Sequence, residues 1–113
     1  MVKAPYVPER GDIVWVSFDP RLGHEQGGAR SAIVLSRRIY NEPSSLAVVC
    51  PITSQRKGYP FEVPLAADLA VTGVVLCDQL RTLDWRARRF RFACAAPPPT
   101  VAAVAQRASL LVA

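Results

Sequence analysis

Residues 31–52 read SAIVLSRRIYNEPSSLAVVCPI, and this stretch decides the fold class. Two short apolar runs rich in β-branched residues, at 31–36 and 46–52, flank a polar segment at 40–45. Runs of this length and composition are typical of strands, and the polar segment has the composition of a turn. We therefore predict a strand, a turn region and a second strand here.

Further strands are predicted on both sides of this pair. Residues 12–18 alternate in a β-rich run that Asp19 and Pro20 close. Similar short runs follow at 61–64, 73–77 and 79–83. Because Pro60 and Pro64 flank the run at 61–64, we expect this strand at a sheet edge or near a barrel rim.

The C-terminal segment has a different period. After three prolines at 97–99, the run that follows Thr100 reads VAAVAQRASLLVA, with apolar residues at a spacing of three and four. This predicts a helix with Thr100 as its N-cap. Several short strands and one terminal helix predict a mainly β fold, built as a small, strongly bent sheet or partly open barrel. With 113 residues, we expect a single domain over residues 1–113.

The overall charge favours an anionic partner. Fourteen Lys and Arg against nine Asp and Glu give a net charge of +5 and a pI near 9.6. Such a balance suits nucleic acid, although many basic domains bind nothing acidic. Cys50, Cys77 and Cys94 are widely spaced among apolar residues, which indicates reduced thiols in a cytoplasmic protein. No secretory signal or membrane-spanning run is visible.

Several catalytic arrangements are excluded by counting residue types. His24 is the single histidine, which excludes a zinc site with several imidazoles and a two-histidine ribonuclease mechanism. Neither GxxxxGK[ST] nor GxGxxG occurs, and we expect no cofactor. A carboxylate, arginines and hydroxyls remain, and they are concentrated in two polar loops.

The two loops offer groups that suit phosphate chemistry. Residues 21–30, RLGHEQGGAR, contain Glu25 and Arg30 around Gly27 and Gly28, which could act as a base and a phosphate clamp. Residues 53–59, TSQRKGY, combine hydroxyls, two cations and an aromatic ring. A solvated surface loop and a basic hairpin tip are the plain alternatives for these two segments.

Six motifs occur in one order along nearly the whole chain, and together they resemble the MazF/PemK toxins: GDIVW at 11–15, FDP at 18–20, GHEQGGAR at 23–30, PITSQ at 51–55, KGYPFEV at 57–63 and DQLRTLD at 78–84. The resemblance is greatest to the MazF branch, which carries KGYPFEV and an aromatic residue after the last motif, here Trp85. It implies an SH3-like barrel of the CcdB/PemK type and a homodimer.

The resemblance also implies a function. The toxin of a type II toxin–antitoxin system would cut single-stranded messenger RNA at specific sequences, without a metal, and so inhibit translation. The expected partners are a MazE-like antitoxin with an acidic, partly disordered segment and, through the antitoxin complex, operator DNA.

The site residues are carried over by position. Arg30 matches the family's essential arginine, Thr53 its essential threonine and Glu25 its acidic loop residue. The expected RNA-binding residues are Phe18, Ser54, Gln55, Lys57, Gln79 and Arg81. Ser31 stands where the family usually has proline, which affects the stiffness of the loop rather than its chemistry.

Cleavage without a metal requires the 2′-OH of the RNA to attack the adjacent phosphate, which leaves a 2′,3′-cyclic phosphate and a 5′-OH. We expect Glu25 to act as the base, Arg30 to stabilise the phosphorane and Thr53 to hold a non-bridging oxygen. The division of acid and base roles between Glu25 and Arg30 stays open. Bases splayed from the strand would stack on aromatics such as Phe18 or Tyr59, and the recognised sequence also stays open.

The remaining aromatic, sulfur and imidazole groups have structural interpretations. Trp15 and Cys77 are predicted to lie in the core, and Trp85 to cap the barrel or contact a second protomer. His24 is interpreted as a loop residue rather than a catalyst. A non-catalytic SH3-like binding module and a gyrase-poisoning toxin of the same fold remain as alternatives. The joint presence of Glu25, Arg30 and Thr53 favours the enzyme.

Overall fold

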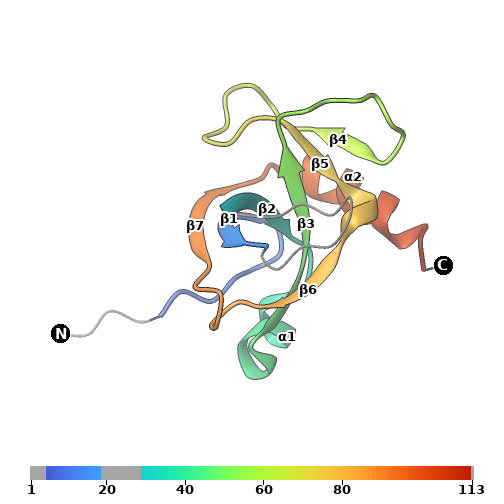
Figure 1. Ribbon diagram of the computed structural model, residues 1–113. Coiled ribbons are helices and arrows are strands. Elements are labelled where there is room, and N and C mark those ends of the chain that lie inside the picture. Colours follow the sequence, from blue (N-terminus) through green and yellow to red (C-terminus); the bar gives the residue numbers. More distant parts are fainter. Residues whose placement is uncertain (1–4, 19–28, 113) are drawn as a thin grey trace.

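The computed structural model describes residues 5–18 and 29–112 (Figure 1). Its elements, in chain order, are β1 (Asp12–Ser17), β2 (Ala29–Val34), α1 (Arg38–Ser44), β3 (Leu46–Thr53), β4 (Glu62–Pro64), β5 (Val74–Leu76), the 3-10 helix η1 (Cys77–Gln79), β6 (Arg81–Asp84), β7 (Arg91–Ala95) and α2 (Pro98–Ser109). The predicted class, mainly β with a C-terminal helix, is confirmed.

Strand β3 organises the sheet because it pairs with three neighbours. Val49 is paired on both sides, with Val34 of β2 and with Arg81 of β6, whereas Ile52 and Thr53 pair with β5. The antiparallel path runs β4-β5-β3-β2-β1-β7, with β6 beside β3. No pairing among the described residues joins β4 to β7, so the sheet is not closed and the predicted barrel is not confirmed.

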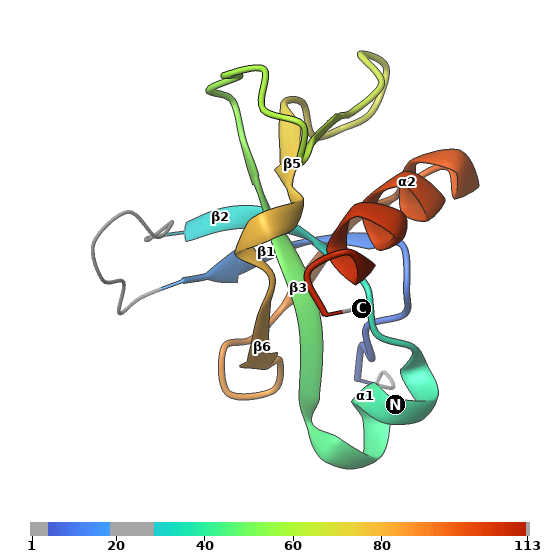
Figure 2. The ribbon, with the colours of Figure 1, turned by 90° about the vertical axis from the view of Figure 1, so that its right-hand side faces the viewer.

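Alternate residues of the central strands enter two different hydrophobic cores, because successive side chains of a strand point to opposite faces. The first core holds Val14, Val16 and Phe18 of the β1 segment and is closed by Trp85 and Phe90. The second core holds residues from β1, β2, β3 and β5 together with Val104 of α2. Helix α2 lies along one side of the sheet in Figure 2 and contacts η1 and β4. This packing fixes η1 beside the end of β3.

The strands predicted at 12–18, 31–36, 46–52, 61–64, 73–77 and 79–83 are all confirmed, with bounds that differ by at most two residues. Two elements were not predicted. Much of the expected turn at 40–45 belongs to helix α1, and β7 pairs with β1. Helix α2 begins at Pro98 rather than after a Thr100 cap, because proline suits the first helical position, where no N–H is needed.

The two tryptophans differ in burial, and Trp15 differs from its prediction. The prediction that Trp15 is a core residue is wrong, since 41% of its surface is exposed. Its register partners across the sheet are Ser31 and Arg91, so polar rather than apolar residues lie beside it. Trp85 is buried in the first core, and its Nε1 donates to the carbonyl of Asn41 at 2.8 Å. Cys77 is fully buried, as predicted.

None of the helices within residues 5–18 and 29–112 has the length and apolar character needed to span a membrane.

Candidate active site at the end of strand β3

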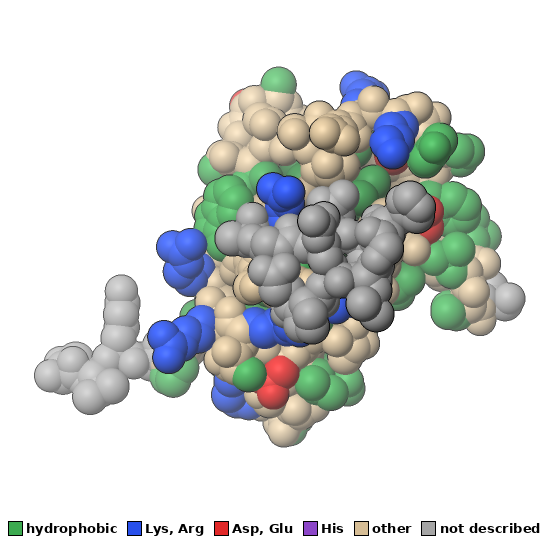
Figure 3. All heavy atoms as spheres, viewed as in Figure 1, with side chains coloured by type: hydrophobic (Ala, Val, Ile, Leu, Met, Phe, Trp, Pro, Cys, Tyr) green, Lys and Arg blue, Asp and Glu red, His purple; other side chains and the backbone are tan. Residues whose placement is uncertain are grey.

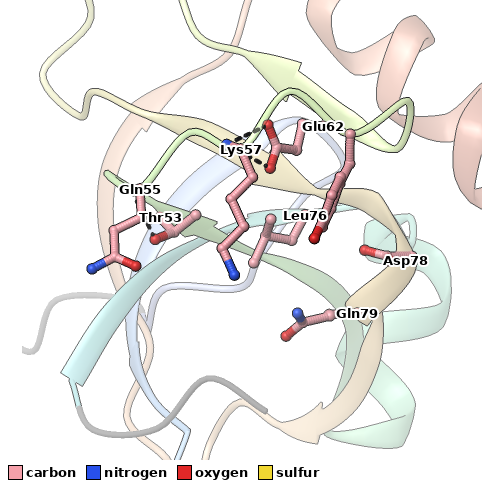
Figure 4. Close-up of a pocket in the computed structure, with 8 residues that line it drawn as sticks. Thr53, Gln55, Lys57, Glu62, Leu76, Asp78 and Gln79 are labelled. Carbon is pink, nitrogen blue, oxygen red and sulfur yellow. Dashed lines mark hydrogen bonds between the residues drawn. The ribbon is translucent and has the colours of Figure 1, made fainter. Parts of the chain in front are cut away.

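The end of β3 borders a pocket of about 430 Å³ (Figure 4). Pockets of this size hold small ligands or one unit of a larger ligand. The lining residues come from the end of β3, the loop that follows it, β4, β5 and η1, and they are Thr53, Gln55, Lys57, Tyr59, Glu62, Leu76, Asp78 and Gln79. This mixture of hydroxyl, cation, amide, carboxylate and aromatic groups suits a polar ligand.

Thr53 and Arg30 lie on the adjacent strands β3 and β2. The described β2–β3 pairs run from Val34–Val49 to Ala32–Pro51 and end two residues before Arg30 and Thr53, which pair instead with β1 and β5. Both residues share the face of their strand that carries the first core, because Arg30 pairs with Val16 of that core across β1. Arg30 is exposed and Thr53 is half-buried, and both follow this face beyond the last β2–β3 pair.

Local contacts fix the position of Thr53. Its Oγ1 accepts a hydrogen bond from the backbone N–H of Gln55 at 3.2 Å, which bends the chain at the strand end. Gly73 lies directly behind it with a φ of +123°, and a Cβ at this glycine would lie 2.3 Å from the Thr53 carbonyl oxygen. Strand β5 can reach Thr53 because residue 73 has no side chain.

Phe18 and Arg81 form one unit at the edge of the first core. The guanidinium of Arg81 lies 5.6 Å from the centre of the Phe18 ring, and its Nη1 donates to the Phe18 carbonyl at 3.3 Å. Phe18 itself has no exposed surface. The predicted stacking of a base on this ring thus requires the ring to be uncovered, whereas the half-buried Arg81 keeps its charge near the surface.

The loop after β3 carries Lys57 over the pocket. The Lys57 side chain extends between Thr53 on one side and Gln79 on the other (Figure 4). The carboxylate of Glu62 accepts hydrogen bonds from the backbone N–H groups of Lys57, at 3.2 Å to each oxygen, and of Gly58 at 2.9 Å. The backbone of this loop is therefore held from β4.

The other predicted residues have different positions around the pocket. Gln79 of η1 and Gln55 line it, whereas the exposed Ser54 is not among the lining residues. Glu25 and His24 lie outside the described residues, as does the loop at 21–28 that carries them. The structure thus brings together Thr53, Gln55, Lys57 and Gln79 at the pocket, whereas Arg30 lies on the neighbouring strand β2 and is not among the lining residues.

Two carboxylates beside the pocket, Glu62 and Asp78, were not among the predicted site residues. Glu62 is only 9% exposed, although it stands in a short strand where an apolar residue could pack. The signal in the sequence is a charged residue between Phe61 and Val63, directly before a position that enters the core. Asp78 follows the buried Cys77 and is exposed at the pocket.

Electrostatics distinguish structural from reactive groups. Burial raises the pKa of the Cys50 thiol to about 12 and that of Cys77 to about 11, so neither forms a thiolate nucleophile at neutral pH. Backbone N–H donation from Ala87, followed by the hydroxyl of Ser45, lowers the pKa of Asp84, whose carboxylate organises the turn between β6 and β7.

Within residues 5–18 and 29–112, no three His, Cys, Asp or Glu side chains gather as a metal-ion site.

Basic side chains are prominent on one face of the molecule. On the face seen in Figure 3, Lys and Arg side chains are exposed at several places, and Asp and Glu at few. The fold and the site together define a small basic β protein whose guanidinium, hydroxyl and amide groups suit a phosphodiester substrate.

Comparison with known proteins identifies the family. The chain belongs to the family described as "PemK-like, MazF-like toxin of type II toxin-antitoxin system", which matches residues 9–112. The curated "Endoribonuclease toxin MazF" of Escherichia coli (strain K12) is 49% identical over 83 residues, which are 74% of this chain and 74% of that protein.

Solved structures agree with this assignment. A crystal structure of MazF (Form-I) from Deinococcus radiodurans is 50% identical, with a TM-score of 0.91 over 95% of this chain and 97% of that chain. A MazE-MazF structure (Form-II) from the same organism is 45% identical, with a TM-score of 0.84 over 95% of this chain and 96% of that chain.

Proposed function

We propose that this toxin endoribonuclease cuts single-stranded RNA at the end of β3, without a bound metal, through attack of the substrate's own 2′-OH. The observation that supports the proposal is the pocket at the end of β3, which Thr53, Lys57 and Gln79 line, with Arg30 on the adjacent strand β2. A guanidinium can contact two phosphate oxygens at once and keeps its charge. The products are a 2′,3′-cyclic phosphate and a 5′-OH.

The proposed division of labour uses three side chains. Arg30 stabilises the charge that develops on the phosphorane, and Thr53 holds a non-bridging oxygen. Glu25, which lies outside the described residues, removes the 2′-OH proton; this role rests on the family resemblance. Ser54, Gln55, Lys57, Gln79 and Arg81 contact the RNA strand, and Phe18 supports Arg81 from the core.

An antitoxin is the expected partner, because the family is that of type II toxin–antitoxin systems and the relative from Deinococcus radiodurans is seen in MazE-MazF structures. We infer that its acidic segment covers the basic face near the pocket. We further propose a homodimer, contact of the antitoxin complex with operator DNA, and an SH3-like barrel of the CcdB/PemK type as the single domain of residues 1–113.

The test is a cleavage assay with purified protein and a long messenger RNA in the presence of chelator. We expect discrete fragments that end in a cyclic phosphate, and no cut in an oligonucleotide that carries one deoxynucleotide 5′ to a mapped cut site. A 5′-phosphate product, or activity that chelator removes and magnesium restores, would contradict the mechanism. If the RNA stays intact and the protein inhibits gyrase on supercoiled DNA, the protein is a gyrase-poisoning toxin and the proposed RNA cleavage is wrong.

A further inference from the structure

The loop at residues 57–61 is held by charged side chains that lie outside it. Glu62 is nearly buried, and its carboxylate accepts hydrogen bonds from two successive backbone N–H groups, those of Lys57 and Gly58. Gly58 has a φ of +80°, which lets the chain turn so that both N–H groups face the carboxylate. A carboxylate, rather than a β ladder, therefore fixes the backbone of Lys57.

A second contact holds the far side of the loop. The Nε of Arg107, on helix α2, donates to the carbonyl of Pro60 at 3.0 Å. The Nη1 of the same guanidinium donates to the Ala103 carbonyl of its own helix at 3.3 Å, which restricts the side chain. The loop is therefore tied to a helix that itself packs against η1 and β4.

The position of Glu62 is not explained by packing alone. Burying a carboxylate costs free energy unless hydrogen bonds compensate for the lost water. Val63 beside it enters the second core and supplies the apolar contact of this short strand. The three hydrogen bonds that the Glu62 carboxylate accepts from the loop compensate for this cost. The contact with the loop therefore explains why a carboxylate stands at this position.

The loop carries two pocket-lining side chains that are otherwise exposed, Lys57 and Tyr59. A lysine on a mobile loop loses backbone and side-chain freedom when it binds a phosphate, whereas a lysine on a fixed loop loses less. We propose that Glu62 and Arg107 are positioning residues for RNA binding, which hold the loop so that Lys57 and Tyr59 meet the strand. This inference rests on the proposed function of the pocket.

The first experiment measures steady-state cleavage of an RNA oligonucleotide that spans a mapped cut site. Glu62→Gln and Arg107→Gln should each raise KM about tenfold, the equivalent of one or two hydrogen bonds, and change kcat by less than about twofold. Arg107→Lys, which retains a cationic donor, should recover part of the loss. The matched controls are Glu42→Gln and Arg38→Gln, an exposed ion pair on α1 at 3.5 Å. Helix α1 lies at the opposite end of the molecule from β4 and β5 (Figures 1 and 2).

A double-mutant cycle separates positioning from general stability. If Glu62 acts by placing Lys57, then Lys57→Ala should weaken binding of the deoxy-substituted oligonucleotide much less in the Glu62→Gln background than in the native protein. Additive effects, or an unchanged KM in both Glu62→Gln and Arg107→Gln, would overturn the inference. Normal cleavage by Lys57→Ala and Thr53→Ala would instead overturn the proposed site, so the two failures are distinguishable. If Glu62→Gln does not fold, the same cycle is run with Arg107→Gln.

Discussion

Arg30 and Thr53 supply a charge and a hydroxyl from adjacent strands, and each is held by backbone pairing rather than by a mobile loop tip. Groups fixed in advance stabilise a transition state without reorganisation. We predict that Arg30→Ala and Thr53→Ala each lose about 2 to 4 kcal/mol of transition-state stabilisation, the cost of removing one preorganised donor. Single-turnover cleavage rates measure this loss directly.

Conservative variants at the same positions provide the controls. Thr53→Ser retains an oxygen that can accept from the Gln55 N–H, so it should keep most of the rate. Arg30→Lys keeps the charge but not the two-pronged geometry and should be slow. Antitoxin binding and thermal midpoints should remain close to those of the native protein. A near-normal rate for Arg30→Ala would show that the site has been placed wrongly.

Two glycines near the site differ in what surrounds them. Gly73 and Gly58 both have positive φ, but a Cβ on Gly73 would collide with the Thr53 backbone, whereas a Cβ on Gly58 meets nothing within 4 Å. We predict that Gly58→Ala costs about 1 to 2 kcal/mol of stability, from backbone conformation alone, and that Gly73→Ala costs clearly more.

Urea unfolding of the two alanine variants measures the difference. Gly73→Ala should also lower the cleavage rate, because β5 can no longer pair with Thr53 as it does here. Equal losses of stability in the two variants would mean that the close approach of Gly73 to Thr53 is not needed.

At the scale of elements, the Asn41 side chain holds helix α1 to the segment before β1 and to the segment after β2. This side chain is fully buried; its Nδ2 donates to the carbonyls of Pro8 and Ser36 at 2.9 and 3.0 Å, and its Oδ1 accepts from the Ser36 hydroxyl. We predict that Asn41→Ala lowers the free energy of unfolding by about 2 to 4 kcal/mol, because each buried polar group left without a partner costs about 1 to 3. Denaturant unfolding tests this value.

Trp85→Phe removes a different contact of the same helix, the one to the backbone carbonyl of Asn41. It keeps an aromatic ring in the first core but loses the donation from Nε1 to the Asn41 carbonyl, so it should cost less than Asn41→Ala. The opposite order of stabilities would contradict the role assigned to Asn41.

Helix α1 also shows where prediction from sequence fails. Its segment contains Pro43 and polar residues, which locally indicate a turn, and the helix is held by contacts from Pro8 and Trp85 that are distant in the chain. Strand β7 is similar, since its Arg91 and Phe92 are exposed and give no clear alternation. The strands with apolar, β-branched runs were predicted because their local pattern and their burial agree.

In the candidate site too, some residues could be predicted from the sequence and others could not. Thr53 and Arg30 were predicted from motifs, and they lie on adjacent strands. Glu62 could not be identified, because its role depends on backbone N–H groups of Lys57 and Gly58 that face it only after the loop has turned. Residue types reveal side-chain chemistry, but they do not reveal which backbone N–H groups a side chain will meet.

At the scale of the whole molecule, the segment that follows α2 exposes apolar side chains. Leu110, Leu111 and Val112 are 65%, 44% and 81% exposed. Contiguous apolar surface on a small protein marks an interaction site, and a second copy of the chain is the proposed occupant. We predict that the native protein scatters light as a dimer and that Leu110→Lys with Leu111→Lys shifts it towards monomer. A monomeric native protein at micromolar concentration would exclude this interface.

The net charge of +5 implies that two anionic partners compete for this protein. RNA and an acidic antitoxin segment are both drawn to the same cations, so they should exclude each other from the basic face. Saturating antitoxin should therefore stop cleavage, and the inhibition should weaken as salt rises. Lys57→Ala should reduce the dependence of log K for RNA on log salt by about 0.7, the value for one lost phosphate contact on a single strand. A charge-neutral change at the exposed ion pair, Glu42→Gln with Arg38→Gln, is the control and should leave the slope unchanged. An acidic partner that binds tightly and yet leaves cleavage untouched would show that the antitoxin acts elsewhere on the molecule.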